Sequence, residues 1–162
     1  VDSIDGRLNR MEINGIDILV DYAHTPDGFE KIFAYAQAIQ KEGKIIVVFG
    51  SAGKRDKEKR PVLGEIASRY CDLIILTEED NRDEKVIDIN AEIKAGITNG
   101  VQTLSIPDRY EAIEKAVDSA SINDLILILG KGAETFLDRE HGSEPWISDT
   151  KAVELIKKNR NY

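Results

Sequence analysis

The chain has 162 residues, of which 41% are hydrophobic and 32% are charged, and its formal net charge is −8. This length suits a single domain with one good core. The acidic balance argues against nucleic-acid binding, because affinity for a duplex comes largely from lysine and arginine side chains that neutralise phosphates. The sequence has no apolar stretch of eighteen residues and no basic-then-apolar start, so we expect a cytoplasmic protein without a membrane span or signal peptide. The single cysteine, Cys71, fits a reducing compartment and is interpreted as a core thiol.

The first elements in chain order are a hairpin and a helix. Two apolar-patterned runs, 8–13 and 16–20, flank Asn14-Gly15, a dipeptide typical of tight turns between antiparallel strands. After Pro26 the apolar residues recur at helical spacing as far as Ile39, and Gly43 follows. Asp21 and Thr25 are candidate caps for this helix. We therefore expect an antiparallel pair of strands at the start and then a helix.

The remainder alternates between strands and helices. Strands are predicted at 45–49, 73–76, 101–105 and 125–129. Helices are predicted at 61–70, 86–95 and 151–158, and a further helix is expected to begin after Asp108, which can cap it. The apolar runs at 45–49 and 125–129 have no polar alternation, which is typical of central strands covered by helices on both faces. The order predicts an α/β, Rossmann-like, doubly wound fold with a mostly parallel six-stranded sheet and an antiparallel N-terminal edge hairpin.

Polar segments follow four of the predicted strands at their carboxyl ends. They are 21–25, 50–56, 77–82 and 130–134. A parallel sheet brings these ends to one edge, so the four segments are expected to line one crevice. Glycine-containing loops that expose backbone N–H groups, together with Lys54, Arg55 and Lys131, indicate anion recognition.

Each segment by itself has a plainer interpretation. The sequence lacks the phosphate-loop pattern G-x-x-x-x-G-K-[ST], and no G-x-G-x-x-G joins a strand to a helix, so an autonomous nucleotide triphosphatase or dehydrogenase is not expected. Gly130-Lys131-Gly132 is equally consistent with a simple turn. The helix start with Lys57, Lys59 and Arg60 is interpreted as solvated, and the polar loop 138–144 is expected to place His141 at the surface. The acids 78–80 are interpreted as solvated or helix-capping rather than as a metal site.

Taken together, five segments resemble the carboxyl-terminal domain of the Mur ligases, and most closely that of the tripeptide synthetases (MurE type). The matching segments are Gly6-Arg7-Leu8-Asn9, Asp21-Tyr22-Ala23-His24-Thr25-Pro26, 49–56 with Lys59-Arg60-Pro61, Asp80-Asn81, and Gly130-Lys131-Gly132-Ala133-Glu134. The five segments occur in the order and at the spacing of the family, and together they span nearly the whole chain. The resemblance implies that residues 1–162 form one Mur ligase C-terminal domain without the N-terminal UDP-binding and central ATPase domains.

The activity implied by this resemblance is ATP-dependent amide bond formation in bacterial peptidoglycan synthesis. The carboxylate of UDP-N-acetylmuramoyl-L-alanyl-D-glutamate becomes an acyl phosphate, and the amine of the third amino acid attacks it. The cofactors implied are ATP and Mg²⁺, bound mainly by the central domain with its phosphate loop and carbamylated lysine. The resemblance therefore implies no catalytic residue and no metal ligand here, and a chain that is inactive alone. The partners implied are the UDP-muramyl dipeptide, an amino acid and the chain's own central domain, and we expect a monomer.

The resemblance also implies site residues. Arg7, Asp21 and His24 would face ATP when the domains close, with Tyr22 in a supporting role. The residues that would bind the amino acid are Arg55, Asn81, Arg82, Gly130 and Glu134, with guanidinium groups for carboxylates and Glu134 for an ammonium or distal polar group. Lys54 and Lys131 are weaker candidates.

Two departures from the family pattern leave the amino acid open between L-lysine and meso-diaminopimelate. Relatives that select meso-diaminopimelate usually carry Asp-Asn-Pro-Arg, whereas this chain has Asp80-Asn81-Arg82-Asp83. With a deletion, Arg82 would serve the distal carboxylate; without one, Asp83 takes the arginine position and mildly favours a cationic side chain. Ala133 also replaces a frequent histidine. The equivalent domain of a polyglutamate or cyanophycin synthetase and a stand-alone Rossmann-like binding module are the alternative functions.

Overall fold

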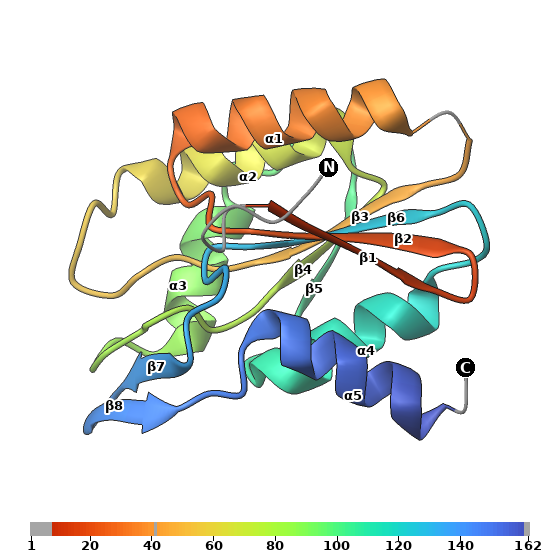
Figure 1. Ribbon diagram of the computed structural model, residues 1–162. Coiled ribbons are helices and arrows are strands. Elements are labelled where there is room, and N and C mark those ends of the chain that lie inside the picture. The colour runs from red at the N-terminus through yellow and green to blue at the C-terminus, as the bar shows by residue number, and fades with distance from the viewer. Residues whose placement is uncertain (1–7, 41, 161–162) are drawn as a thin grey trace.

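A six-stranded sheet divides the molecule into two helical layers (Figure 1). The computed structural model describes residues 8–40 and 42–160. The strands lie in the order β1-β2-β6-β3-β4-β5. Their bounds are β1 Leu8–Ile13, β2 Ile16–Asp21, β3 Ile45–Phe49, β4 Leu73–Leu76, β5 Gln102–Ser105 and β6 Leu125–Leu129. β1 pairs antiparallel with β2, and the other neighbours pair in parallel. The predicted sheet and its edge hairpin are confirmed.

The turn of the N-terminal hairpin has the conformation that its sequence requires. Asn14 and Gly15 have φ values of 47° and 84°, and the strands close on the pair Ile13 and Ile16. Asparagine and glycine tolerate these left-handed conformations better than other residues do, which is why this dipeptide sets the register of the hairpin.

Helices cover both faces of the sheet. α1 (Pro26–Ile39), α2 (Lys59–Tyr70) and α3 (Val86–Lys94) lie on one face, and α4 (Arg109–Ser119) and α5 (Asp149–Asn159) on the other (Figure 1). Thr25 caps α1 by accepting a hydrogen bond from the Gly28 N–H, and Asp108 caps α4 by accepting one from the Glu111 N–H. Both caps were predicted. None of the helices in the described ranges is both long enough and apolar enough to traverse a bilayer.

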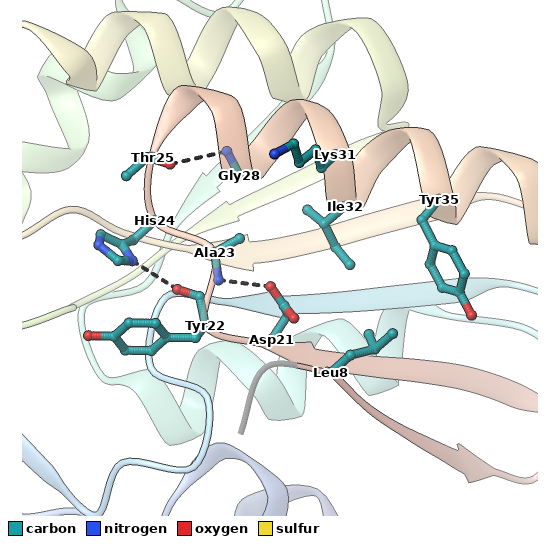
Figure 2. Close-up of a pocket in the computed structure, with 10 residues that line it drawn as sticks. All are labelled: Leu8, Asp21, Tyr22, Ala23, His24, Thr25, Gly28, Lys31, Ile32 and Tyr35. Carbon is teal, nitrogen blue, oxygen red and sulfur yellow. Dashed lines mark hydrogen bonds between the residues drawn. The ribbon is translucent and has the colours of Figure 1, made fainter. Parts of the chain in front are cut away.

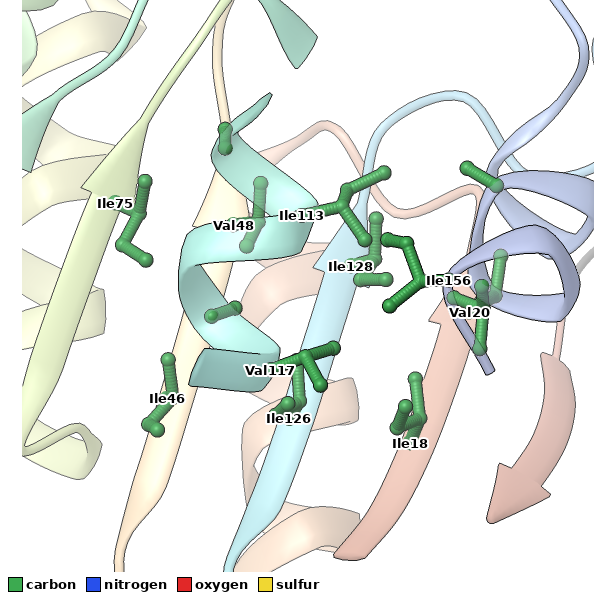
Figure 3. Close-up of a cluster of buried hydrophobic side chains, with 14 of the residues drawn as sticks. Ile18, Val20, Ile46, Val48, Ile75, Ile113, Val117, Ile126, Ile128 and Ile156 are labelled. Atoms are coloured by element: carbon green, nitrogen blue, oxygen red, sulfur yellow. The ribbon is translucent and has the colours of Figure 1, made fainter. Parts of the chain in front are cut away.

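The core consists of two apolar layers, one on each face of the sheet. In the layer under α4 and α5, Ile18, Ile46 and Ile126 and their neighbours pack against Ile113, Val117 and Ile156 (Figure 3). The intervening strand residues, such as Val47 and Leu127, face α1, α2 and α3. Successive residues of a strand point to opposite faces, so a strand covered on both sides is apolar throughout. Cys71 is buried in the second layer, as predicted, and burial raises the pKa of its thiol.

The segment 138–144 is not a polar loop but part of a second, antiparallel hairpin. β7 (Phe136–Arg139) pairs with β8 (Gly142–Pro145). The hairpin extends from the edge where the parallel strands end (Figure 1). β8 is exposed throughout, and β7 buries only Leu137. Strands that bury so little carry no alternating apolar pattern, so the sequence did not indicate them. His141 lies exposed at the turn, as predicted.

Candidate functional site

The four polar segments converge at the carboxyl edge of the sheet, as predicted. The strands that they follow, β2, β6, β3 and β4, are consecutive neighbours in the sheet. Backbone hydrogen bonds join the segments: the Gly130 N–H donates to the Asp21 carbonyl (3.1 Å), and the Gly53 N–H to the Asp80 carbonyl (2.9 Å). Among the cavities at this edge, one lies beside α1 and another over Gly130. We call them the α1 cavity and the Gly130 cavity.

The α1 cavity has a volume of about 400 Å³ and lies between the first turns of α1 and the end of β2. Figure 2 shows Leu8, Ile32 and Tyr35 along its wall, with Asp21 and His24 among the polar groups that face it. The Asp21 carboxylate accepts a hydrogen bond from the Ala23 N–H (2.9 Å), so this contact fixes the turn after β2 rather than capping α1. An apolar wall with a few polar groups is typical of sites for small molecules and cofactors.

The position of His24 is set by its own segment and by α2. Its Nδ1 lies 2.9 Å from the Tyr22 carbonyl, which can only accept, so in the neutral ring Nδ1 carries the proton and Nε2 is an acceptor. The Tyr22 ring packs edge-on against the imidazole, with ring centroids 4.8 Å apart. The His24 carbonyl accepts a hydrogen bond from Lys59 Nζ (2.8 Å). Tyr22 and His24 line both cavities, and Lys59 lines the Gly130 cavity. The hydrogen bond from Lys59 to the His24 carbonyl therefore lies between the α1 cavity and the Gly130 cavity.

The Gly130 cavity, of about 160 Å³, is lined by residues from all four segments. Arg55, Arg82 and Glu134 are among them. Arg55 is exposed and forms no hydrogen bond or ion pair with any residue in 8–40 or 42–160. Arg82 Nη1 donates to the Gly53 carbonyl (2.7 Å), and Nη2 lies 3.8 Å from Asp138. The cavity thus combines guanidinium groups with carboxylates, a pairing suited to a ligand that carries both charges.

Lys131 and Lys54 do not present free ammonium groups to this cavity. Lys131 is fully buried, and its Nζ lies 3.0 Å from each Asp80 carboxylate oxygen and 2.8 Å from Glu134 Oε1. Lys54 Nζ lies 3.4 Å from Asp83, and both side chains are more than half exposed. The expectation that Lys131 serves anion recognition is therefore wrong in its simple form, because its charge holds the segment after β6 to the segment after β4.

Two of the acids after β4, Glu78 and Glu79, are buried, so the interpretation of them as solvated is wrong, whereas Asp80 is partly exposed and Glu78 has the helix-capping role that was the alternative. Glu78 accepts two hydrogen bonds from the Arg139 guanidinium and one from the Arg109 N–H at the start of α4. Glu79 is 6% exposed, and burial raises the pKa of its carboxyl to about 8 although Arg109, Lys59 and Lys131 act in the opposite direction. Sequence reasoning did not select Glu79 as a site residue, although it lines the Gly130 cavity.

Arg60 is also buried, against the expectation of a solvated helix start. Its guanidinium donates to both Glu84 carboxylate oxygens (2.7 and 2.9 Å) and to the Ala52 carbonyl (3.0 Å). The hydrogen bonds from Arg60 lower the pKa of Glu84 to about 2. Because Glu84 also accepts from the Lys54 N–H, this group ties the segment that carries Arg55 to the segment after β4.

The structure brings together most of the residues that the resemblance indicated. Asp21 and His24 line the α1 cavity, whereas Arg7 lies outside the described residues. The residues of the second set that line the Gly130 cavity are Arg55, Arg82, Gly130 and Glu134. Asn81 does not: its Nδ2 donates to the carbonyls of Arg82 and Glu84, and it borders a separate cavity beside the β7–β8 hairpin. Throughout 8–40 and 42–160, no group of three or more His, Cys, Asp or Glu side chains is placed to hold a metal ion.

Comparison with known protein families gives a consistent result. A family model described as "Mur ligase, glutamate ligase domain" matches residues 6–132. The UDP-N-acetylmuramyl-tripeptide synthetase of Roseiflexus sp. (strain RS-1) is 46% identical over 152 residues, which cover 90% of this chain and 30% of that protein. The UDP-N-acetylmuramoyl-L-alanyl-D-glutamate–2,6-diaminopimelate ligase of Aquifex aeolicus (strain VF5) is 40% identical over 154 residues, which cover 95% of this chain and 32% of that protein.

Solved structures agree with the sequence comparison. A UDP-N-acetylmuramoyl-L-alanyl-D-glutamate–2,6-diaminopimelate ligase aligns with a TM-score of 0.89 at 29% identity, over 100% of this chain and 33% of that one. E. coli FolC in complex with ADP aligns with a TM-score of 0.65 at 16% identity, over 98% of this chain and 33% of that one, which shows a shared fold. The chain spans about a third of the length of the relatives that it matches.

Proposed function

The chain belongs to the Mur ligase family, as its C-terminal domain, and from this premise we propose that it is part of a longer ATP-dependent ligase that adds the third amino acid to UDP-N-acetylmuramoyl-L-alanyl-D-glutamate. The observation that carries the proposal is the Gly130 cavity, where Arg55, Arg82 and Glu134 meet at the edge of the sheet. An amino acid at neutral pH carries a carboxylate and an ammonium group, and this set has a partner for each. The UDP-binding and ATPase domains then lie in the remainder of the longer protein.

The α1 cavity is proposed to contact the nucleotide when the domains close. What supports this is its apolar wall beside the His24 ring, since a nucleotide base is a flat group with polar edges. His24 Nε2 is an acceptor in the neutral ring, and Asp21 adds a carboxylate to the same cavity. Closure over the nucleotide would also exclude water from the reacting groups, which prolongs the life of an acyl phosphate.

The amino acid is proposed to be meso-diaminopimelate rather than L-lysine. What supports this is the position of the two residues that the sequence left as alternatives. Arg82 lines the Gly130 cavity, whereas Asp83 does not and is paired with Lys54. A guanidinium group facing the ligand favours a second carboxylate, which meso-diaminopimelate has and L-lysine lacks.

Mg²⁺ is proposed to be bound outside this chain. The described residues do not fit a metal ion, because no three His, Cys, Asp or Glu side chains among them are grouped to hold one, and three carboxylates near the cavity are paired with cations: Glu78 with Arg139, Asp80 with Lys131 and Glu84 with Arg60. What this chain contributes to the reaction is the orientation of the amino acid and the closure over the nucleotide. Its cations near the cavity, Arg55 and Arg82, also favour the negative charge that develops as the acyl phosphate reacts.

The test is amide formation by the intact ligase with ATP, UDP-N-acetylmuramoyl-L-alanyl-D-glutamate and either amino acid, followed by mass spectrometry of the product. We expect tripeptide formation with meso-diaminopimelate. Arg82→Ala should raise the KM for that amino acid at least tenfold, which corresponds to the loss of about 1.4 kcal/mol. Asp83→Ala is the matched control and should leave the KM unchanged. A larger effect of Asp83→Ala, with L-lysine as the better substrate, would show that the amino acid is assigned wrongly.

A further inference from the structure

Glu79 has a carboxyl group that the rest of the described structure does not use. The residue is 6% exposed and lines the Gly130 cavity, yet its carboxyl forms no hydrogen bond or ion pair with any residue in 8–40 or 42–160. It packs directly against the Gly130 backbone: a Cβ atom placed on Gly130 would lie 1.9 Å from Glu79 Oε1. A buried carboxylate without a donor is costly, so a group in this position needs either a proton or a cationic ligand.

The cations near Glu79 are committed to other partners. Arg109 is bound in bidentate fashion to Asp149 and also donates to the carbonyls of Glu78 and Leu129. Lys131 is paired with Asp80 and Glu134, and Lys59 Nζ donates to the His24 carbonyl.

The acids around Glu79 add negative charge. Asp80 raises the pKa of Glu79, and Glu134 and Asp56 line the same cavity, as do the phenol of Tyr22 and the guanidinium groups of Arg55 and Arg82. Burial is the largest influence on the Glu79 carboxyl, and its pKa of about 8 follows from it. A pKa of about 8 favours the protonated form of this carboxyl at pH 7 when no ligand is bound.

We infer that Glu79 binds an ammonium group of the incoming amino acid and releases its proton to solvent as that group arrives. The inference rests on the proposed function and adds a residue to its amino-acid site. The Glu134 and Asp80 carboxylates already have a Lys131 partner, at 2.8 and 3.0 Å, and Asp56, which also lines the cavity, is exposed to solvent; among the described residues Glu79 is therefore the buried carboxyl of this cavity whose charge lacks a partner. The Glu79 O–H bond breaks, the proton passes to water or buffer, and an ammonium–carboxylate ion pair replaces it.

This arrangement makes recognition dependent on charge. A ligand that brings an ammonium group stabilises the ionised Glu79, whereas a ligand with a neutral or anionic group in its place leaves the carboxyl protonated. Binding then becomes tighter as the pH rises toward 8, because the proton no longer has to be displaced. Each bound amino acid should therefore release most of a proton at pH 7 and much less at pH 9, because the free carboxyl is largely protonated below its pKa of about 8 and largely ionised above it.

The state of the free carboxyl is tested by carbon NMR of the chain labelled at the glutamate side-chain carboxyl. We expect one glutamate resonance with a midpoint near pH 8, absent from the spectrum of Glu79→Gln. A Glu79 resonance that titrates at about pH 4–5 in the folded wild-type chain would overturn the inference, whatever the activity of the variant.

Proton release is tested by calorimetry of the intact ligase with meso-diaminopimelate in two buffers of different ionisation enthalpy. We expect release at pH 7 that vanishes at pH 9, no release with Glu79→Gln and at least tenfold weaker binding by that variant, while Glu79→Asp retains part of the release. Asp83→Asn, outside the cavity, is the control and should match the wild type. Undiminished release by a folded Glu79→Gln enzyme contradicts the inference. If the intact ligase forms tripeptide but releases no proton on binding, the inference is wrong and the proposed function stands; if it neither binds nor uses either amino acid, both are wrong.

Discussion

Replacement of Arg109 by methionine is expected to destabilise the domain strongly, because Arg109 is the centre of a buried charge network. Arg109 and Asp149 are both fully buried and are joined by two hydrogen bonds of 2.8 and 2.9 Å. The guanidinium also donates to the carbonyls of Glu78 and Leu129, the residues directly before Glu79 and Gly130. Arg109 thus joins α4 and α5 to the two strand ends beneath the Gly130 cavity.

The size of the effect follows from what the variant would leave behind. Arg109→Met removes the donors for a buried carboxylate, which then keeps one side-chain donor, Trp146 Nε1 at 3.2 Å. Breaking a buried ion pair by removing one partner costs about 3–5 kcal/mol. The unfolding entropy of a chain of this length is about 0.3 kcal/mol/K, so Tm should fall by roughly 10–15 °C.

The assay is urea unfolding of the chain followed by circular dichroism, together with thermal unfolding. Arg69→Met is the control, because Arg69 also forms ion pairs, with Glu30 and Glu65, but all three side chains are about two-fifths exposed. The control should cost less than about 1 kcal/mol, as exposed ion pairs do. The reasoning is refuted if Arg109→Met costs no more than Arg69→Met, since the penalty was assigned to burial.

Three further predictions concern the residues around the cavities. Gly130→Ala should lower stability and amino-acid affinity more than Gly142→Ala. Both positions have strongly positive φ (109° and 123°), so the backbone strain of an alanine costs about 1–3 kcal/mol at each, but of the two only Gly130 has a neighbour, Glu79, with which a Cβ would collide. Equal losses of unfolding free energy in urea would exclude the effect of this collision. Ionised Glu84 should stabilise the fold fully above pH 4.5 and lose this contribution as the pH falls toward 2, because its pKa is lowered to about 2 in the folded chain. The free energy of unfolding, measured with urea between pH 6 and pH 3, should therefore depend less on pH in Glu84→Gln than in the wild type, and an equal pH dependence would contradict this. His24→Ala in the intact ligase should raise the KM for ATP about tenfold and change the KM for the amino acid less; an unchanged KM for ATP would remove His24 from the nucleotide site.

The sequence by itself determined the elements and their order, because these depend on local patterns. The apolar run 45–49 has the composition of a strand covered on both faces, and Thr25 and Asp108 cap their helices through bonds to residues three positions away. The carboxyl-edge crevice was also predictable, because parallel strands end on one side of the sheet. The β7–β8 hairpin was not, since its strands bury only Leu137 and therefore have no periodic pattern.

Only the tertiary structure decided which charged residues are available for chemistry. From the sequence, Arg60 and Glu79 were interpreted as solvated and Lys131 as a cation of the site, yet all three are buried. The partners that compensate the charges of Lys131 and Arg60 are far away in the chain: Lys131 pairs with Asp80, 51 positions away, and Arg60 with Glu84, 24 positions away. The free energy of a buried charge depends on such distant partners and on the exclusion of water, and neither is encoded in a local pattern. For this reason the sequence indicated where the site lies and suggested Arg55 and Arg82, whereas only the fold placed the buried Glu79 beside them in the lining of the Gly130 cavity.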